Sequence, residues 1–182
     1  AAVAKIPELI NVLVNPFSLA NGFQGPDQPA DNTPYEDEAT GMWVAPFIMA
    51  AINTKNVHRS NALLDHAYGE DFLYDEMMIT GAGEEGKAIA EFVAKTQPGE
   101  GPDKAAREAG NYDNLFIGTT PEGDRIEAAS GGDMDPGYGS TSKMLAESAM
   151  CLLQDCDSLS VGIYTPAPAM GDKLITRLVD NA

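Results

Sequence analysis

Apolar residues recur every three to four positions in several stretches of the chain, which is the spacing of one face of an α-helix. Pro46 suits the first turn of the first long stretch, because the N–H that proline lacks would have no partner there. The pattern predicts helices over residues 44–64, 84–96, 140–154 and 171–179, and the end of an apolar helix over residues 8–14.

Shorter runs rich in β-branched and aromatic residues predict strands. Residues 115–119 and 125–129 flank Thr-Pro-Glu-Gly-Asp, a sequence typical of a hairpin turn. Residues 72–80 and 161–164 are also strand-like, and Thr-Pro-Ala-Pro from position 165 is expected to break the chain. Residues 15–41 hold repeated Pro and Gly without an apolar period, which predicts an extended arm with little regular structure.

The order of these elements is helix, strand, helix, hairpin, helix, strand, helix. We therefore expect the α+β class: a mixed or antiparallel sheet with helices packed on one face. A length of 182 residues suits one domain with a core of its own, so we expect a single domain over residues 1–182.

Net charge is the compositional feature that limits the possible partners. The 28 acidic and 11 basic side chains give a net charge of −17. That charge repels phosphate backbones and anionic lipids, so nucleic acids and membrane surfaces are poor partners. Uninterrupted apolar runs stay well below the roughly 20 residues of a membrane span. Lys5, Pro7 and Glu8 interrupt the first apolar stretch, which argues against a signal peptide. We expect a cytoplasmic, globular protein.

Cys151 and Cys156 are the two cysteines of the chain, and we expect both to be reduced thiols. Together with His58 and His66 they match no zinc-site spacing, so no metal-binding residue is predicted.

The sequence Gly-Ala-Gly-Glu-Glu-Gly at 81–86 matches the G-x-G-x-x-G pattern of dinucleotide-binding loops. In such a loop the helix N-terminus stabilises the pyrophosphate, and here Glu84 and Glu85 would oppose it. Acidic residues at a helix start also interact favourably with the helix dipole. We interpret the segment as a turn and a helix start, and we assign no cofactor-binding residue to this chain.

One group of candidate site residues lies at the start of the helix predicted over 140–154. A tyrosine between glycines, three hydroxyls and a lysine could bind an anionic group or donate a proton. The alternative is a capped helix start, which the spacing alone favours. The candidates are Tyr138 and Lys143 as catalytic residues and Ser140, Thr141 and Ser142 as substrate-binding residues.

A second group lies within residues 51–62. Asn53, Asn56 and Asn61 are poor helix formers, yet all three fall inside a predicted helix. Arg59 could hold a carboxylate with two hydrogen bonds, and the alternative is an ordinary surface cation. We take Asn53, Arg59 and Asn61 as further candidate substrate-binding residues.

Several segments in one consistent order carry a family resemblance. They are residues 25–29, 43–54, 59–64, 68–76, 98–102, 135–147 and 165–171. Over roughly residues 9–182 the chain resembles the second half of saccharopine dehydrogenase-like proteins, a group that includes the trans-acting enoyl reductases. The resemblance implies a two-part enzyme: an N-terminal Rossmann half that binds NAD(P)H and lies outside this chain, and an α+β half that completes the substrate cleft.

The resemblance further implies the function of this half. It would be the substrate-binding and dimerisation domain of an NAD(P)-dependent oxidoreductase that reduces an enoyl, imine or carbonyl group. Its partners would be its own Rossmann domain, a small-molecule or lipid-like substrate and a second copy of the chain. The hydrogen-bonding groups at residues 138–143, beside glycines, lead us to expect that this segment and the helix around Asn53 and Arg59 face the shared cleft.

The alternative, from another class of protein, is a stand-alone acidic interaction domain without catalysis. The apolar helix at residues 8–14, with which the sequence opens, favours the enzyme.

Overall fold

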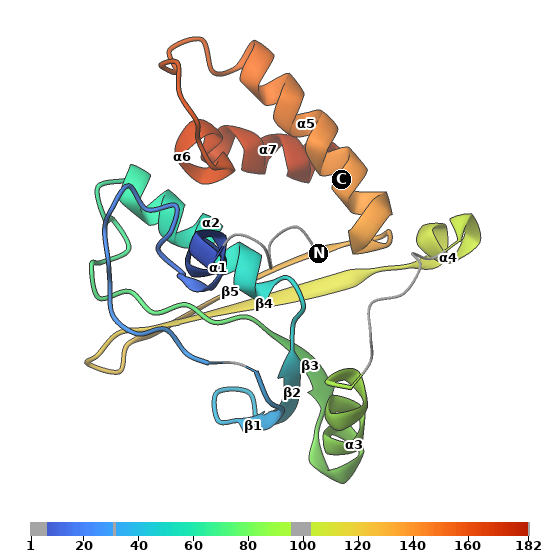
Figure 1. The fold of residues 1–182 in the computed structure, drawn as a ribbon. Helices are drawn as coiled ribbons and strands as arrows, with labels where there is room; N and C mark the ends of the chain where they lie inside the picture. Colours follow the sequence, from blue (N-terminus) through green and yellow to red (C-terminus); the bar gives the residue numbers. More distant parts are fainter. Residues whose placement is uncertain (1–6, 31, 96–102, 182) are drawn as a thin grey trace. The chain divides into compact units, whose positions relative to one another are not determined.

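The structure is a computed structural model that describes residues 7–30, 32–95 and 103–181. The chain forms two compact units (Figure 1). Unit 1 comprises residues 1–97 and 163–168, and unit 2 comprises residues 98–162 and 169–182. Helices and antiparallel strands occur in both, which confirms the α+β class. The single domain over residues 1–182 stays a prediction.

Unit 1 contains a three-stranded antiparallel sheet in the order β1-β2-β3. Its strands are β1 (Tyr35–Asp37), β2 (Met42–Pro46) and β3 (Met77–Gly81). Helix α3 (Gly83–Val93) packs against β2 and β3 (Figure 1). Val44, Ala45 and Ala90 are buried in this unit, which also contains α1 (Pro7–Val14) and α2 (Ala50–Leu63).

The helix predicted over residues 44–64 is in fact two elements. Residues 44–46 belong to β2, where Val44 pairs with Ile79 and Pro46 with Met77, and α2 begins only at Ala50. The prediction was wrong there because apolar periodicity cannot separate a short buried strand from a buried helical turn.

The strand predicted over residues 72–80 begins only at Met77. Upstream of it, the Gln28 side chain takes the place of a neighbouring strand. Its Nε2 donates to the Phe72 carbonyl at 3.4 Å, and the Tyr74 N–H donates to its Oε1 at 3.0 Å. The described residues of the arm over 15–41 contain no α-helix and one short strand, β1, as the sequence predicts.

Aromatic contacts join the arm to α2 and to the loop that follows it. The rings of Phe17 and His58 lie 4.4 Å apart, and those of Phe23 and His66 lie 4.2 Å apart. His58 is 3% exposed, and its burial lowers the pKa of the imidazole below its ordinary value. This part of the core therefore depends on a neutral histidine.

The loop at residues 81–86 connects β3 to α3, and its glycines have a conformational explanation. Gly81 and Gly83 have φ values of +118° and +64°. A Cβ on Gly86 would lie 2.2 Å from the Gly81 carbonyl oxygen, so the helix approaches the strand too closely for a side chain. Glu84 and Glu85 occupy the first turn of α3, which agrees with the interpretation as a turn and a helix start.

Unit 2 contains a hairpin and helices. Strands β4 (Tyr112–Thr119) and β5 (Arg125–Gly132) pair in register around the predicted turn, each longer than the sequence predicts. Helices α5 (Thr141–Gln154) and α7 (Asp172–Asn181) pack against each other, near their predicted positions. The predicted loop over 98–111 contains α4 (Lys104–Ala109), while residues 98–102 lie outside the described residues.

Two predictions for residues 161–170 are wrong. Residues 161–164 form no strand, and Pro166–Met170 is a short helix, α6, instead of a chain break. Pro166 stands at the first helical position, where its fixed φ favours a helix and its missing N–H leaves no bond unmade.

Cys151 and Cys156 are free thiols in the small core of unit 2, where they contact Met170. Burial raises the pKa of the Cys151 thiol, so it stays protonated. In the described ranges, His, Cys, Asp and Glu side chains form no group that could hold a metal ion. Nor is any described helix long and apolar enough to cross a membrane.

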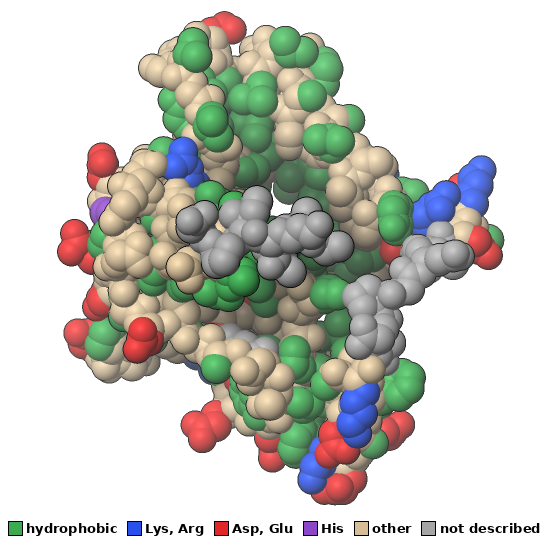
Figure 2. Space-filling model, viewed as in Figure 1, with side chains coloured by type: hydrophobic (Ala, Val, Ile, Leu, Met, Phe, Trp, Pro, Cys, Tyr) green, Lys and Arg blue, Asp and Glu red, His purple; other side chains and the backbone are tan. Residues whose placement is uncertain are grey.

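Large apolar side chains remain exposed on α5 and α7. Figure 2 shows hydrophobic side chains at the surface over these helices. The exposed fractions are 60% or more for Leu145, Leu153, Ile175 and Val179. An apolar surface of this kind is typical of a region that contacts another protein segment.

Candidate functional site

The candidates Asn53, Arg59 and Asn61 lie along α2, in unit 1. Asn56 precedes Arg59 by three residues and Ser60 by four, so these three residues share one side of the helix. Segment 163–165, which belongs to the same unit, contacts this side through Arg59 and Ser60.

Arg59 binds three backbone or side-chain oxygens, and all three are neutral. Its Nη1 donates to the Leu19 carbonyl at 2.9 Å and to Oδ1 of Asn21 at 2.6 Å, while its Nη2 donates to the Ile163 carbonyl at 2.8 Å. Among the described residues, no carboxylate forms an ion pair with Arg59. A guanidinium has five N–H donors, so Nε and one N–H of Nη2 remain available.

An open cavity of about 310 Å³ lies beside this guanidinium. Its lining consists of Leu19, Asn56, Arg59, Ile163, Tyr164 and Thr165. The hydroxyls of Ser60 and Thr165 form a buried hydrogen bond of 2.6 Å, which fixes the segment next to α2. The cavity thus combines one cation with apolar walls.

Asn53 points to a different neighbour. Its Nδ2 lies 2.9 and 3.1 Å from the two carboxylate oxygens of Glu76, and the Tyr74 phenol donates to the same carboxylate at 3.4 Å. Burial, and then the charge of Glu76, raise the pKa of Tyr74 to about 12. This phenol therefore stays protonated at neutral pH, and the Asn53 amide is engaged with a carboxylate.

Asn61 holds the loop that follows α2. Its Nδ2 donates to the Gly69 carbonyl at 2.8 Å, and its Oδ1 accepts from the Tyr68 N–H at 2.9 Å. The side chain is only 2% exposed. These contacts favour a structural role for Asn61 over the substrate contact that the sequence suggests.

The candidates at residues 138–143 lie in unit 2, where a π-helical turn, η2 (Pro136–Ser140), leads into α5. Oδ2 of Asp135 accepts from the backbone N–H of Tyr138 at 2.7 Å, so this aspartate caps the turn. The Asp-Pro-Gly sequence signals such a cap, since proline follows the capping residue.

The hydroxyls of this group donate to nearby backbone carbonyls: Ser140 to Met134, Thr141 to Pro136 and Ser142 to Gly139. Lys143 lies 3.5 Å from Asp133 in an exposed ion pair. Tyr138 is 60% exposed. The geometry is that of a capped helix start that presents one phenol to solvent.

The structure places the two groups in different compact units, so their common cleft stays a prediction. Arg59, Asn56 and segment 163–165 come together, while Asn53 and Asn61 are engaged elsewhere.

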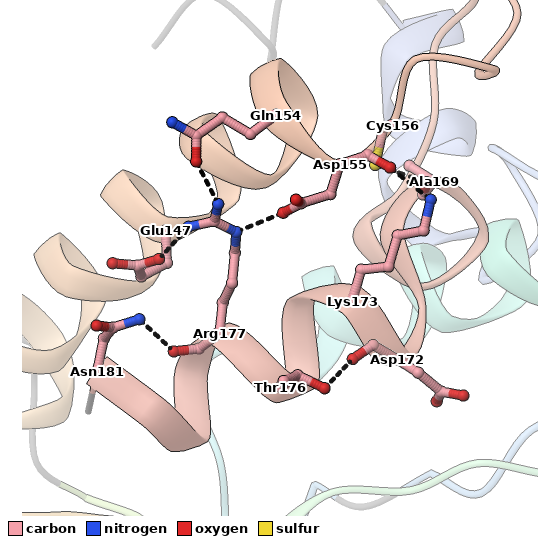
Figure 3. A network of polar contacts seen from close by, with 10 residues as sticks. All are labelled: Glu147, Gln154, Asp155, Cys156, Ala169, Asp172, Lys173, Thr176, Arg177 and Asn181. Carbon is pink, nitrogen blue, oxygen red and sulfur yellow. Dashed lines mark hydrogen bonds and ion pairs between the residues drawn. The ribbon is translucent and has the colours of Figure 1, made fainter.

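A second arginine, Arg177 on α7, was not among the predicted site residues. Its Nε donates to Oδ2 of Asp155 at 2.6 Å, its Nη1 to Oε2 of Glu147 at 3.1 Å and its Nη2 to Gln154 (Figure 3). The hydrogen bond with Asp155, followed by that with Glu147, raises the pKa of Arg177 above its ordinary value. Arg177 therefore joins α7 to α5 through an ionic cluster in which two carboxylates offset the charge of the guanidinium.

Comparison with known proteins found relatives in mycobacteria. A protein of Mycobacterium tuberculosis (strain H37Rv), named as a candidate trans-acting enoyl reductase, is 41% identical over 168 aligned positions. Trans-acting enoyl reductases of Mycobacterium ulcerans and Mycobacterium bovis are 36% and 34% identical. Each alignment covers 78% of this chain and 40% of the relative.

No protein-family model matches the chain, and no solved structure matches it. These three relatives do not bear the saccharopine dehydrogenase name, so that part of the resemblance stays a prediction. The chain is similar to trans-acting enoyl reductases over 78% of its length, and it spans 40% of the length of these relatives.

Proposed function

We propose that this chain is the substrate-side part of an enoyl reductase-like oxidoreductase that belongs with the trans-acting enoyl reductases. The observation that carries the proposal is the identity of 34–41% over 78% of the chain to proteins of that name. The relatives are more than twice as long as the matched part, which leaves room for a further domain.

The proposed reaction reduces a carbon–carbon double bond next to a carbonyl group. A reduced nicotinamide held outside this chain would supply a hydride to one carbon and would leave oxidised, while solvent or a side chain would supply a proton to the other carbon. The loop at residues 81–86 does not suit a dinucleotide, because Glu84 and Glu85 occupy the first turn of α3. We therefore assign the hydride donor to the part of the protein outside this chain.

Within this chain, the proposal gives two side chains a role near the substrate. The exposed phenol of Tyr138 orients the substrate carbonyl or donates the proton, and the Lys143 ammonium stabilises the negative charge that develops on the carbonyl oxygen. Ser140, Thr141 and Ser142 shape the turn that presents the phenol.

A stand-alone acidic interaction domain is the second candidate. The net charge of −17 and the exposed apolar side chains of α5 and α7 favour it. In the leading proposal the same apolar surface contacts the Rossmann domain or a second copy of the chain.

The test is reduction of an enoyl thioester by the full-length protein with NADPH and with NADH. We expect loss of reduced nicotinamide and a product heavier by two hydrogen atoms. Tyr138→Phe and Lys143→Met should each lower turnover at least tenfold, about 1.4 kcal/mol of transition-state stabilisation. Tyr112→Phe, on β4 of the same unit, is the matched control that should keep full turnover.

If the full-length protein reduces no enoyl, imine or carbonyl compound with either nicotinamide, the oxidoreductase proposal fails. Binding of another protein without any turnover would then favour the interaction domain.

A further inference from the structure

We propose that the cavity beside Arg59 binds an oxyanion, a carboxylate or a phosphate, that is attached to an apolar chain. The inference rests on the proposed function only in that it takes this ligand to be the substrate of the enzyme. The binding site itself is argued from the contacts of Arg59 and of the walls around it.

Among the residues that the structure describes, no carboxylate neutralises the charge of Arg59. All three of its acceptors are neutral oxygens, although the chain carries 28 acidic side chains. An Nε–H and one Nη2–H remain without an acceptor among the described residues, and two such donors match the two oxygens of a carboxylate or a phosphate. A guanidinium that keeps its positive charge and has two N–H donors without an acceptor attracts an oxyanion.

The walls of the cavity favour an apolar chain on that oxyanion. Leu19, Ile163 and Tyr164 contribute apolar surface, and the exposed fraction of Ile163 reaches 84%. An apolar ligand chain that covers these side chains removes them from water, which favours binding roughly in proportion to the area covered. A bare inorganic anion has no apolar chain to cover these side chains, so its binding would lack this favourable contribution.

The site is also held in place before the ligand binds. Two bonds from Nη1 attach the guanidinium to residues 19 and 21, and the bond between Ser60 and Thr165 fixes the opposite wall. Little side-chain freedom of Arg59 is left to lose on binding. Asn56 lines the same cavity, is exposed, and precedes Arg59 by one helical turn, so its amide can donate to the same oxyanion.

Within the described part of the chain, the lining contains no carboxylate, which excludes an ordinary cation site. A single guanidinium is also too little positive charge for a nucleic-acid backbone in a chain of net charge −17. An amphiphilic anion is the ligand class that fits both the charge and the walls.

The experiment is a calorimetric titration of this chain, without nicotinamide, with four probes: decanoate, decyl phosphate, decanol and inorganic phosphate. We expect at least one of the two charged amphiphiles to bind, and to bind at least tenfold more tightly than decanol and inorganic phosphate. Preference for decanoate identifies a carboxylate ligand, preference for decyl phosphate a phosphate ligand, and equal binding the shared oxyanion chemistry.

Variants then locate the site. Asn56→Asp places a carboxylate beside the guanidinium on an exposed position, and should weaken binding of the charged amphiphile at least tenfold. Asn32→Asp makes the same change on an exposed arm residue that does not line the cavity, and should leave binding unchanged. Ile163→Ser should weaken binding of the amphiphile and leave inorganic phosphate unaffected.

The inference is overturned if neither charged amphiphile binds, if decanol binds equally well, or if Asn56→Asp binds as the unchanged chain does. None of these results depends on turnover. Binding without reductase activity in the full-length protein would contradict the proposed function alone, and activity without binding would contradict this inference alone.

Discussion

Arg59 in unit 1 and Arg177 in unit 2 differ in the charge of the groups that they bind. Arg177 donates to two carboxylates and an amide, so its charge is neutralised where α5 meets α7. Arg59 donates to two carbonyls and an amide, and it borders an open cavity. In a chain with so many carboxylates, an arginine without an ionic partner among the described residues is the more unusual of the two.

These two side chains show how to separate a structural arginine from an arginine that binds a ligand. Both hold together segments that are far apart in the sequence, so hydrogen-bond number does not distinguish them. Partner charge does: a neutralised guanidinium has little electrostatic attraction left for a ligand, whereas a guanidinium on neutral oxygens keeps it.

The largest effect on stability is expected at the neutralised arginine. Arg177→Met leaves Glu147 and Asp155 close together without their cation, and the unfolding midpoint should fall by about 5 °C or more. Arg59→Met should lower it less, because neutral carbonyls can bind water instead. Thermal unfolding followed by circular dichroism at neutral pH measures both.

A second substitution tests whether the lower midpoint of Arg177→Met comes from the unpaired carboxylates. In the Arg177→Met background, Asp155→Asn removes one of the unpaired charges and should recover part of the lost midpoint. Purely additive losses would show that the ionic cluster does not stabilise the contact between α5 and α7.

The next effect concerns the wall of the Arg59 cavity. Ser60→Ala leaves the buried Thr165 hydroxyl without its 2.6 Å partner and should lower the free energy of unfolding by about 1–2 kcal/mol. Ser60→Ala combined with Thr165→Val should recover part of this loss. Ser148→Ala, which removes a hydroxyl bound to its own helix, is the control and should change stability by less than about 0.5 kcal/mol.

Acid should act on unit 1 first, because both histidines of the chain lie there. Burial lowers the pKa of His58 in the folded state below its ordinary value of 6.5. The unfolded chain therefore takes up a proton more readily, so the stability that neutral His58 provides is complete above pH 6.5 and falls as pH drops through the folded pKa.

The measurement is the unfolding midpoint of the chain from about pH 7.5 to about pH 5.5. His58→Phe, which keeps a ring against Phe17 and Phe72, should show a flatter profile. Equal slopes in both proteins would contradict the role of His58.

The smallest effect is expected at Lys143. Its ion pair with Asp133 has a separation of 3.5 Å, and the two side chains are 37% and 81% exposed. Lys143→Met should therefore change the free energy of unfolding by less than about 0.5 kcal/mol in denaturant titrations. A larger loss would mean that any drop in turnover of this variant reflects folding instead of catalysis.

The elements that local chemistry specifies were predictable. The turn sequence at residues 120–124 identifies the hairpin, and apolar periodicity places α3, α5 and α7 within a few residues. Two of the errors fall where distant residues decide the conformation: β2 needs β3 as its partner, and residues 72–74 bind Gln28 from the arm.

The candidate site likewise has one residue that could be predicted from the sequence and neighbours that could not. Arg59 could be chosen from the sequence because a guanidinium is suited to oxyanions wherever it lies. Its neighbours could not, since Leu19 and Ile163 lie 40 and 104 residues away along the chain.

Periodicity, turn residues and side-chain chemistry act over a few neighbouring positions, so the α+β class, the hairpin, the main helices and the candidate arginine could be predicted without a structure. Only the tertiary structure decided that Arg59 meets neutral oxygens and a cavity while Arg177 meets carboxylates. The charge around a side chain depends on which distant segments fold against it, and no local pattern records that.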